Sequence, residues 1–258
     1  MATVISIANQ KGGVGKTTTA LILADMLHRT GHKVLLVDMD AQRNSTQIAG
    51  AKTGAGVPTA YDLLMSELPA GDIIQQTEAF DVIAGDDELK EVDGALQKIG
   101  REFILKRKLE AVNDKYEVII IDTPPARGIA MTNALVASDT VIIPTPCAYF
   151  AMTGLSDFKN TYNEVKYINP ALSVAGILLV QYSERQKATK EWKETLPQIA
   201  EALETSIFET KIRKCQDVEN AQTHQQQLLD YNDRCTAALD YVDFYEELIG
   251  GLNNGSYK

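Results

Sequence analysis

The stretch of sequence that decides the fold is Lys11-Gly12-Gly13-Val14-Gly15-Lys16-Thr17-Thr18. It stands between residues 3–8, an apolar run rich in β-branched side chains, and residues 19–29, a helical run that Gly31 closes. A glycine-rich turn in this position wraps a phosphate with its N–H groups, and the helix N-terminus stabilises the anion. We therefore expect Lys16 to reach the β- and γ-phosphates of a nucleotide and the Thr17 hydroxyl to hold Mg²⁺.

The loop departs from the common pattern G-x-x-x-x-G-K-[ST], whose first glycine would fall at Gln10. It carries two other glycines and a second lysine, Lys11, which taken alone could be an ordinary solvated lysine. The form K-G-G-x-G-K-[ST] resembles the deviant Walker A loop of the ParA/MinD superfamily. The resemblance implies that Lys11 reaches the nucleotide of a partner subunit, so that two chains close face to face around two ATP molecules.

Two more apolar runs end in carboxylates. Residues 33–38 end at Asp38, with Asp40 two residues later, and residues 117–122 end at Asp122. Ligands of open α/β sheets bind at the carboxyl ends of the strands, so we expect these acids beside the phosphate loop. A single aspartate after a strand is common in turns, but three phosphate-site elements in this order indicate a nucleotide site. We predict that Asp38 and Asp122 join Thr17 in holding Mg²⁺.

The resemblance assigns further roles to these acids. The D-x-D strand end is the family's switch I, in which the second acid orients the attacking water, so Asp40 is the expected hydrolytic residue. The alternative is that Asp40 only holds Mg²⁺ or the loop. The segment Asp122-Thr123-Pro124-Pro125 corresponds to switch II. The family usually has proline after D-x-D, whereas this chain has Ala41, which implies a looser switch I.

Strands alternate with helices along the whole chain. The expected strands are 3–8, 33–38, 80–85, 117–122, 139–144 and 172–180, and the expected helices are 19–29, 61–64, 100–113, 151–167, 186–203 and 236–249. The pattern predicts an α/β fold with a doubly wound, mostly parallel sheet and helices on both faces. We expect a single P-loop ATPase domain over residues 1–250, followed by a disordered tail at 251–258.

Composition limits the class of protein. The chain has 258 residues, 45% of them hydrophobic, and no apolar run long enough for a membrane span. Its first residues lead directly into a predicted strand, so we expect no signal peptide. Cys147, Cys215 and Cys235 lie far apart without C-x-x-C spacing, and the three histidines are scattered, which predicts neither a metal nor a disulfide role for them. These features favour a cytoplasmic protein.

The resemblance extends over residues 4–249. Residues 133–135 and 149–155 share in it, and Lys211-Ile212-Arg213-Lys214 resembles the family's I-P-R segment beside the base, here without proline. Ile212 and Arg213 are therefore expected to bind nucleotide, together with residues 11–18. The chain starts without the helix-turn-helix segment of longer family members, so it resembles the short form.

The family's known behaviour implies a DNA-partitioning ATPase. A dimer formed with Mg-ATP would bind DNA without sequence preference, and a centromere-binding partner of the ParB type would stimulate hydrolysis and release it. The expected location is the bacterial cytoplasm, on the nucleoid when ATP is bound. The net charge of −10 excludes a chain that coats DNA over its whole surface but allows a local patch.

Two basic clusters are candidates for that patch. The first comprises Arg185, Lys187, Lys190 and Lys193, whose lysines recur every three residues, and the second comprises Lys211, Arg213 and Lys214. The alternative for the first is an ordinary solvated helix, because Glu191 and Glu194 lie among its lysines.

Other functions remain open at this point. A MinD-like membrane-recruited ATPase needs a basic amphipathic C-terminal helix, whereas residues 250–258 contain one lysine. A reductase of the nitrogenase iron-protein type needs cysteines after Asp122, and the sequence has none between 122 and 141. A biosynthetic ligase would not need Lys11 from a second subunit, and a ParA-like protein could also position a protein cargo. No membrane partner is expected, and the cargo, the partner and filament formation cannot be read from the sequence.

Overall fold

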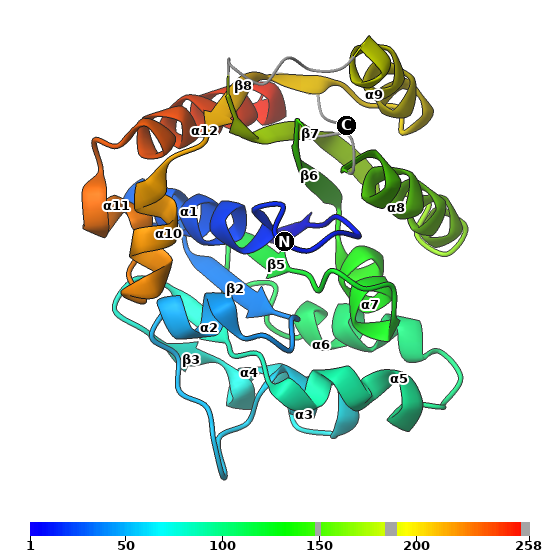
Figure 1. Cartoon of the computed structure of the whole chain (residues 1–258). Helices are drawn as coiled ribbons and strands as arrows, with labels where there is room; N and C mark the ends of the chain where they lie inside the picture. Colours follow the sequence, from blue (N-terminus) through cyan, green and yellow to red (C-terminus); the bar gives the residue numbers. More distant parts are fainter. Residues whose placement is uncertain (148–150, 184–189, 254–258) are drawn as a thin grey trace.

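The computed structural model describes residues 1–147, 151–183 and 190–253. Within these residues, eight strands form one sheet in the order β3-β4-β2-β5-β1-β6-β7-β8 (Figure 1). All neighbours are parallel except β3, which runs antiparallel to β4 at one edge. The strands are β1 (Thr3–Ile7), β2 (Val34–Asp38), β3 (Gln75–Gln76), β4 (Asp81–Ile83), β5 (Val118–Asp122), β6 (Thr140–Pro146), β7 (Ser173–Tyr182) and β8 (Ile207–Arg213).

Helices connect most of these strands. They are α1 (Lys16–Arg29), α2 (Asn44–Ile48), α3 (Ala60–Met65), α4 (Ala70–Ile73), α5 (Val92–Ala95), α6 (Ile104–Glu110), α7 (Ile129–Ala137), α8 (Ala151–Lys166), α9 (Lys190–Ala202), α10 (Gln216–Thr223), α11 (Leu228–Asn232) and α12 (Thr236–Asn253), with short 3₁₀ turns at Asp87–Glu91 and Arg101–Phe103. In the described part of the chain, no helix is both long and apolar enough to span a bilayer.

The central strands are buried on both faces, as a doubly wound sheet requires. Along β2, Val34 and Leu36 pack into the core that includes α1 and α12, whereas Leu35 and Val37 pack on the opposite side against α3, α6 and α7. This alternation follows from the two-residue period of a strand. A third cluster joins α8 and α9 to β6 and β7. The predicted fold class is confirmed.

Helix α1 starts and ends at glycines. Gly15 precedes it with a φ of +80°, so the helix begins at Lys16, three residues before the predicted start. At the other end, Gly31 has a φ of +93°, and the His32 N–H donates to the Leu27 carbonyl at 3.0 Å. This is a Schellman ending, which confirms Gly31 as the C-terminal cap.

Several elements differ from expectation. The sequence patterns did not predict β8 or α7, and α6 is shorter than the predicted helix 100–113. Helix α12 continues to Asn253, so residues 251–253 are helical and the prediction of a tail beginning at 251 is wrong there. Glycine in a helix costs only about 1 kcal/mol, and the packing of Phe244 and Leu248 holds the helix against the sheet. Residues 254–258, the rest of the predicted tail, lie outside the described residues.

Candidate nucleotide site

Three parallel strands deliver the polar groups of the site. Asp38 and Asp122 end the adjacent strands β2 and β5 and are register partners. Strand β1 runs on the other side of β5, with Ile7 paired to Asp122, and leads into the phosphate loop and α1. Because the carboxyl ends of parallel strands meet at one edge, the two aspartates face the start of α1.

The phosphate loop depends on two glycines in the left-handed region. Gly13 has a φ of +70° and Gly15 a φ of +80°, a conformation that L side chains rarely adopt. The loop is also held from outside, because the Gln181 side chain at the end of β7 donates from Nε2 to the Gly13 carbonyl at 2.9 Å. A Cβ on Gly15 would contact Val180 at 3.5 Å, so β7 closes one side of the loop.

Lys16 is a buried cation at the N-terminus of α1. Only 6% of the residue is exposed, and its Nζ donates to the Lys11 carbonyl at 3.0 Å across the loop. Burial lowers the pKa of the Lys16 ammonium, and the carboxylates of Asp122 and Asp40 oppose that shift. A buried ammonium aimed into the loop is suited to the oxygens of a polyphosphate, which agrees with the predicted position of Lys16.

No hydrogen bond of ordinary length and angle joins Asp122 to the described residues, although the Thr17 hydroxyl lies close enough to lower its pKa. Both carboxylate oxygens are fully buried. Burial, with the neighbouring Asp38 carboxylate, raises the pKa of Asp122 to about 8, and Thr17 and Lys16 oppose the shift. A buried carboxyl group of this kind is costly unless a cation neutralises it. Asp122 and the adjacent Thr17 hydroxyl therefore fit the oxygen ligands that Mg²⁺ takes in phosphate sites.

Asp38 makes hydrogen bonds that Asp122 lacks. Its Oδ2 accepts from the Thr46 hydroxyl at 2.6 Å and the Thr46 N–H at 3.0 Å, and its Oδ1 accepts from the Asp40 N–H at 3.0 Å. A Cβ on Gly85 would lie 2.8 Å from Asp38 Cγ, so this position needs glycine. These contacts favour a role for Asp38 in holding the loop after β2. Its predicted contribution to a Mg²⁺ site stays a prediction.

Asp40 differs from both buried acids. It is half-buried, lines the cavity described below, and its Oδ1 accepts only a local hydrogen bond from the Gln42 N–H at 3.0 Å. Its carboxylate lies close enough to Lys16 to affect that pKa. Asp40 therefore lies in the cavity near Lys16, and its predicted hydrolytic role stays a prediction.

These elements surround a cavity of about 440 Å³, a size suited to a nucleotide. Its walls come from the phosphate loop, the segment after β2, the ends of β7 and β8, and α10 and α12, including Gly12–Thr18, Asp40, Gln181, Ile212, Arg213, Lys214, Cys215, Gln222 and Tyr241. Ile212 and Arg213 thus share one cavity with the phosphate loop, although they are about 200 positions away in sequence. Their predicted proximity to the nucleotide agrees with this arrangement.

The wall opposite the phosphate loop is fixed by polar contacts that the sequence did not reveal. Asp240 pairs with Arg213, accepting from Nη2 at 2.7 Å and from Nε at 2.9 Å. Tyr241 and Thr19 join their hydroxyls at 3.0 Å inside the core, which ties α12 to α1. Such contacts between distant segments leave no pattern in a sequence, and the same holds for Thr46.

Lys11 is half-buried at the start of the loop, and the structure describes no ion pair for it within the chain. The start of the loop packs closely on α8, since a Cβ on Gly154 would lie 2.8 Å from Lys11 Cβ and 3.2 Å from the Gln10 carbonyl oxygen. Gln10 Nε2 also donates to Thr161 Oγ1 of α8 at 2.6 Å. The predicted reach of Lys11 to a partner subunit is a property of two chains and stays a prediction.

The predicted DNA contacts are only partly described. Arg185 and Lys187 lie outside the described residues, and Lys190 and Lys193 belong to the start of α9, where their side chains are not among those described. The second cluster, Lys211, Arg213 and Lys214, is exposed at the end of β8. Lys211 Nζ lies 5.2 Å from the centre of the Tyr182 ring, and Lys214 lines the nucleotide cavity, so these two lysines face different surroundings.

Comparison with known proteins shows the family of this chain. The family model described as an AAA domain matches residues 2–174. The sporulation initiation inhibitor protein Soj of Bacillus subtilis is 37% identical over 96% of this chain and 98% of its own length. The chromosome partitioning protein ParA of Caulobacter vibrioides is 34% identical over 95% of this chain and 93% of its own length. The chain belongs to the ParA family of P-loop ATPases.

A solved structure extends the likeness. Cobyrinic acid a,c-diamide synthase of Mycobacterium smegmatis, with bound ADP and magnesium, has a TM-score of 0.83 and 28% identity over 99% of this chain and 97% of its own. The ParA-family fold is therefore shared with a synthase, so the fold does not decide the reaction. Soj and ParA have the higher sequence identity, at nearly complete coverage, so the family assignment rests on them.

Proposed function

We propose that this ParA-family protein is a DNA-partitioning ATPase that binds Mg-ATP, closes into a dimer and holds DNA without sequence preference. The observation that carries the proposal is the phosphate loop with two lysines in distinct settings. Lys16 is buried and points back across its own loop, whereas Lys11 has no ion pair described within the chain. A single bound nucleotide can use Lys16, which leaves Lys11 for a second subunit.

The residues at the loop divide the work of hydrolysis. Lys16 and the loop N–H groups hold the β- and γ-phosphates, and Asp40 orients a water for in-line attack on the γ-phosphate. Mg²⁺, held by Thr17 and Asp122, would neutralise charge on the phosphate oxygens. Lys11 of the partner adds the last positive charge at the γ-phosphate, as an arginine finger supplied in trans does elsewhere. A ParB-type partner would accelerate the reaction and release the dimer from DNA.

The MinD-like alternative needs a basic amphipathic helix that lies on an anionic membrane. Helix α12, the last described element, contains Asp240, Asp243, Glu246 and Glu247 and no lysine or arginine. It also packs Phe244 and Leu248 into the core, so its apolar face is already buried. This helix disfavours recruitment to a membrane, and the proposed location is the cytoplasm and nucleoid.

Retention on DNA against retention on anionic liposomes tests the proposal. The protein is incubated with ATP or ADP and Mg²⁺, and each retention is measured at low and high salt. We expect ATP-dependent retention on random-sequence DNA that falls steeply with salt, because such binding comes from phosphate contacts. ATP-dependent retention on liposomes alone would replace the proposal with the membrane-recruited alternative.

Lys16→Ala is the control for nucleotide dependence, because it removes the buried ammonium from the phosphate loop. The variant should lose ATP binding and all ATP-dependent DNA retention, whereas Lys52→Ala, at an exposed position away from the cavity, should behave as wild type. ATP affinity that survives in Lys16→Ala would show that this loop does not hold the nucleotide.

A further inference from the structure

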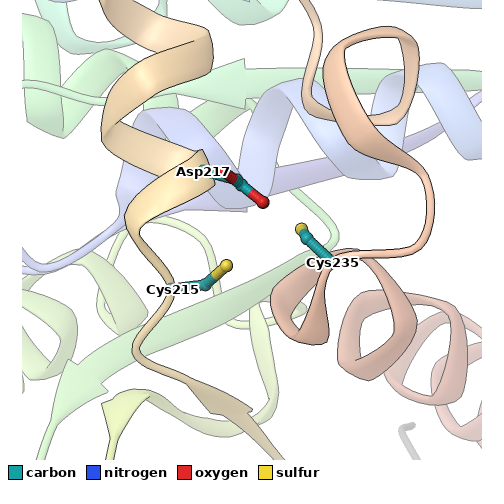
Figure 2. A group of neighbouring side chains, drawn as sticks. All are labelled: Cys215, Asp217 and Cys235. Atoms are coloured by element: carbon teal, nitrogen blue, oxygen red, sulfur yellow. The ribbon is translucent and has the colours of Figure 1, made fainter.

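Two cysteines distant in sequence meet beside the nucleotide cavity. Cys215 follows β8 and is the N-cap of α10, and Cys235 immediately precedes α12. Asp217 lies in the first turn of α10. Their sulfurs and one carboxylate oxygen all lie within 4.8 Å of one another, and the three side chains converge on one point (Figure 2). The expectation that these cysteines stand apart is wrong for this pair.

N–H groups from the starts of two helices approach the sulfur atoms of the cluster. The Ala238 N–H donates to Cys235 Sγ at 3.4 Å from the first turn of α12. Burial raises the pKa of both thiols. At Cys215 the N–H groups of Asp217 and Ala237 and the Thr236 hydroxyl outweigh burial, so its pKa lies below the ordinary value, whereas burial and the neighbouring Cys215 keep the pKa of Cys235 raised. The N-termini of α10 and α12 both meet here, and helix N-termini stabilise thiolates.

A further contact orients the carboxylate. Asn232, at the end of α11, donates from Nδ2 to Asp217 Oδ2 at 2.8 Å. A polar group behind a ligand that fixes its orientation is the usual outer shell of a protein metal site. A disulfide between the two sulfurs would need neither this carboxylate nor its partner.

We propose that Cys215, Cys235 and Asp217 form a binding site for a thiophilic divalent cation of the Zn²⁺ type. Two thiolates and a carboxylate are ligands that Zn²⁺ accepts, and a fourth tetrahedral position would remain for water. With Zn–S distances of about 2.3 Å, two sulfurs of a tetrahedral site lie roughly 3.8 Å apart. Small side-chain rotations therefore bring the three ligand atoms into range.

The position of the site suggests what the cation does. It would join the start of α10 to the start of α12, across a chain segment that includes α11. Cys215 also lines the cavity of about 440 Å³, so the cation would brace one of its walls. Its binding does not depend on the proposed partition function, and it should stabilise the folded chain by mass action.

Cobalt substitution tests the site directly. Chelator-treated, reduced full-length protein without nucleotide is titrated with Co²⁺. We expect one equivalent to give a thiolate-to-cobalt charge-transfer absorption with the visible bands of tetrahedral cobalt, and Zn²⁺ to abolish both. Cys215→Ser and Cys235→Ser should lose the charge-transfer band, whereas Cys147→Ala, which removes the third cysteine, should keep it. A band that is absent in wild type, or unchanged in both serine variants, overturns the proposal.

Two measurements avoid reliance on the cysteine variants. In wild type, Zn²⁺ should slow alkylation of Cys215 and Cys235, read by mass spectrometry peptide by peptide, and raise the Tm. Asn232→Ala keeps all three ligands, and loss of its hydrogen bond should weaken Zn²⁺ affinity by about 10–100-fold. Equal alkylation rates with and without Zn²⁺ contradict the metal site. Ready formation of a Cys215–Cys235 disulfide in a protein whose alkylation and Tm do not respond to Zn²⁺ would replace the metal site with a redox pair.

Discussion

Asp122 shows how a single residue can be unfavourable for stability and useful for binding. Its carboxyl group is buried without a hydrogen bond of ordinary length and angle from the described residues, beside a second carboxyl group at Asp38. Folding therefore favours the protonated form, and a bound cation favours the ionised form. Asp122 lowers the stability of the ligand-free protein, and its carboxylate becomes favourable when Mg²⁺ and phosphate bind.

The first prediction concerns stability against pH. The pKa of Asp122 is about 8 in the folded chain and about 4 when unfolded, so between these values only the folded state keeps the proton. The free energy of unfolding should then fall as pH rises from about 4 to about 8, by at most about 1.4 kcal/mol per pH unit. Urea denaturation of ligand-free wild type and Asp122→Asn measures this. The variant should show a shallower decline, and an identical slope would contradict the assignment.

We expect a change at Asp40 to affect hydrolysis more than folding, because Asp40 is half-buried and the one hydrogen bond described for its carboxylate is a local one. Asp40→Ala should fold and bind ATP as wild type does, whereas hydrolysis should slow by about 10²–10⁴-fold, the usual contribution of a residue that orients or activates a water. ATP affinity and single-turnover hydrolysis separate the two effects. Asp114→Ala, an exposed acid, is the matched control. If Asp40→Ala fails to bind ATP, Asp40 holds the cation or the loop instead.

At the scale of elements, features that depend on consecutive residues could be predicted from the sequence, whereas features that depend on distant contacts could not. The unit β1, phosphate loop and α1 was predictable, because an apolar strand, glycines and a helical run are consecutive. The strands that end at Asp38 and Asp122 were predictable for the same reason. Strand β8 alternates exposed and buried residues only in part, and its basic residues pointed to a surface cluster. Tertiary packing decides the pairing of β8 with β7, and the strand propensity of its residues does not predict that pairing.

The candidate site divides in the same way. Lys16, Thr17 and Asp122 could be found because each follows a short motif. Thr46 holds Asp38 from α2, and Asp240 holds Arg213 from α12, through pairs that only the folded chain brings together. The proximity of Cys215 and Cys235 could not be predicted, because two helices and a loop separate them in the sequence. Sequence spacing detects metal and redox sites when ligands are close in the chain, and it has no signal for ligands that the topology assembles.

The contact between α8 and the phosphate loop makes an element-scale prediction. A Cβ on Gly154 would lie 2.8 Å from Lys11 Cβ and 3.2 Å from the Gln10 carbonyl. Alanine should gain about 1 kcal/mol in helix propensity, but overpacking against a backbone segment typically costs about 1–3 kcal/mol and displaces the loop. Gly154→Ala should therefore lower ATP affinity and the free energy of unfolding, measured by nucleotide titration and urea denaturation. Gly250→Ala on α12, with nothing within 4 Å, should do neither. A Gly154→Ala variant that is more stable than wild type and has normal ATP affinity would contradict this, because it would show that α8 shifts to accommodate the methyl group.

At the scale of the whole molecule, charge opposes the dimer that the proposed function requires. Each chain carries a net charge of −10, so two chains approach against repulsion unless their facing surfaces are locally positive. A nucleotide triphosphate in each cavity adds further negative charge. Lys11 beside Gly12 lies at the mouth of the loop, and a cation that crosses to the partner's phosphates would offset this repulsion where it is strongest. Dimerisation should therefore depend on both ATP and Lys11.

Mixed dimers test whether Lys11 acts across the interface. Alone, Lys11→Ala should bind ATP without hydrolysing it at the normal rate, and Lys16→Ala should bind none. In a mixed dimer the Lys16→Ala chain still carries Lys11 and would serve the nucleotide held by the other chain, because a two-fold interface places the same residues on both sides. We expect the mixture of Lys11→Ala and Lys16→Ala chains to recover hydrolysis that neither variant has alone, with dimers verified by light scattering. In the control, the Lys11→Ala chain is mixed with the double variant Lys11→Ala/Lys16→Ala, and this mixture should recover none. Verified mixed dimers that do not recover hydrolysis would show that Lys11 acts on the nucleotide bound by its own chain. Lys11 would then not offset the repulsion between the two chains, and a closed dimer would lose this electrostatic support.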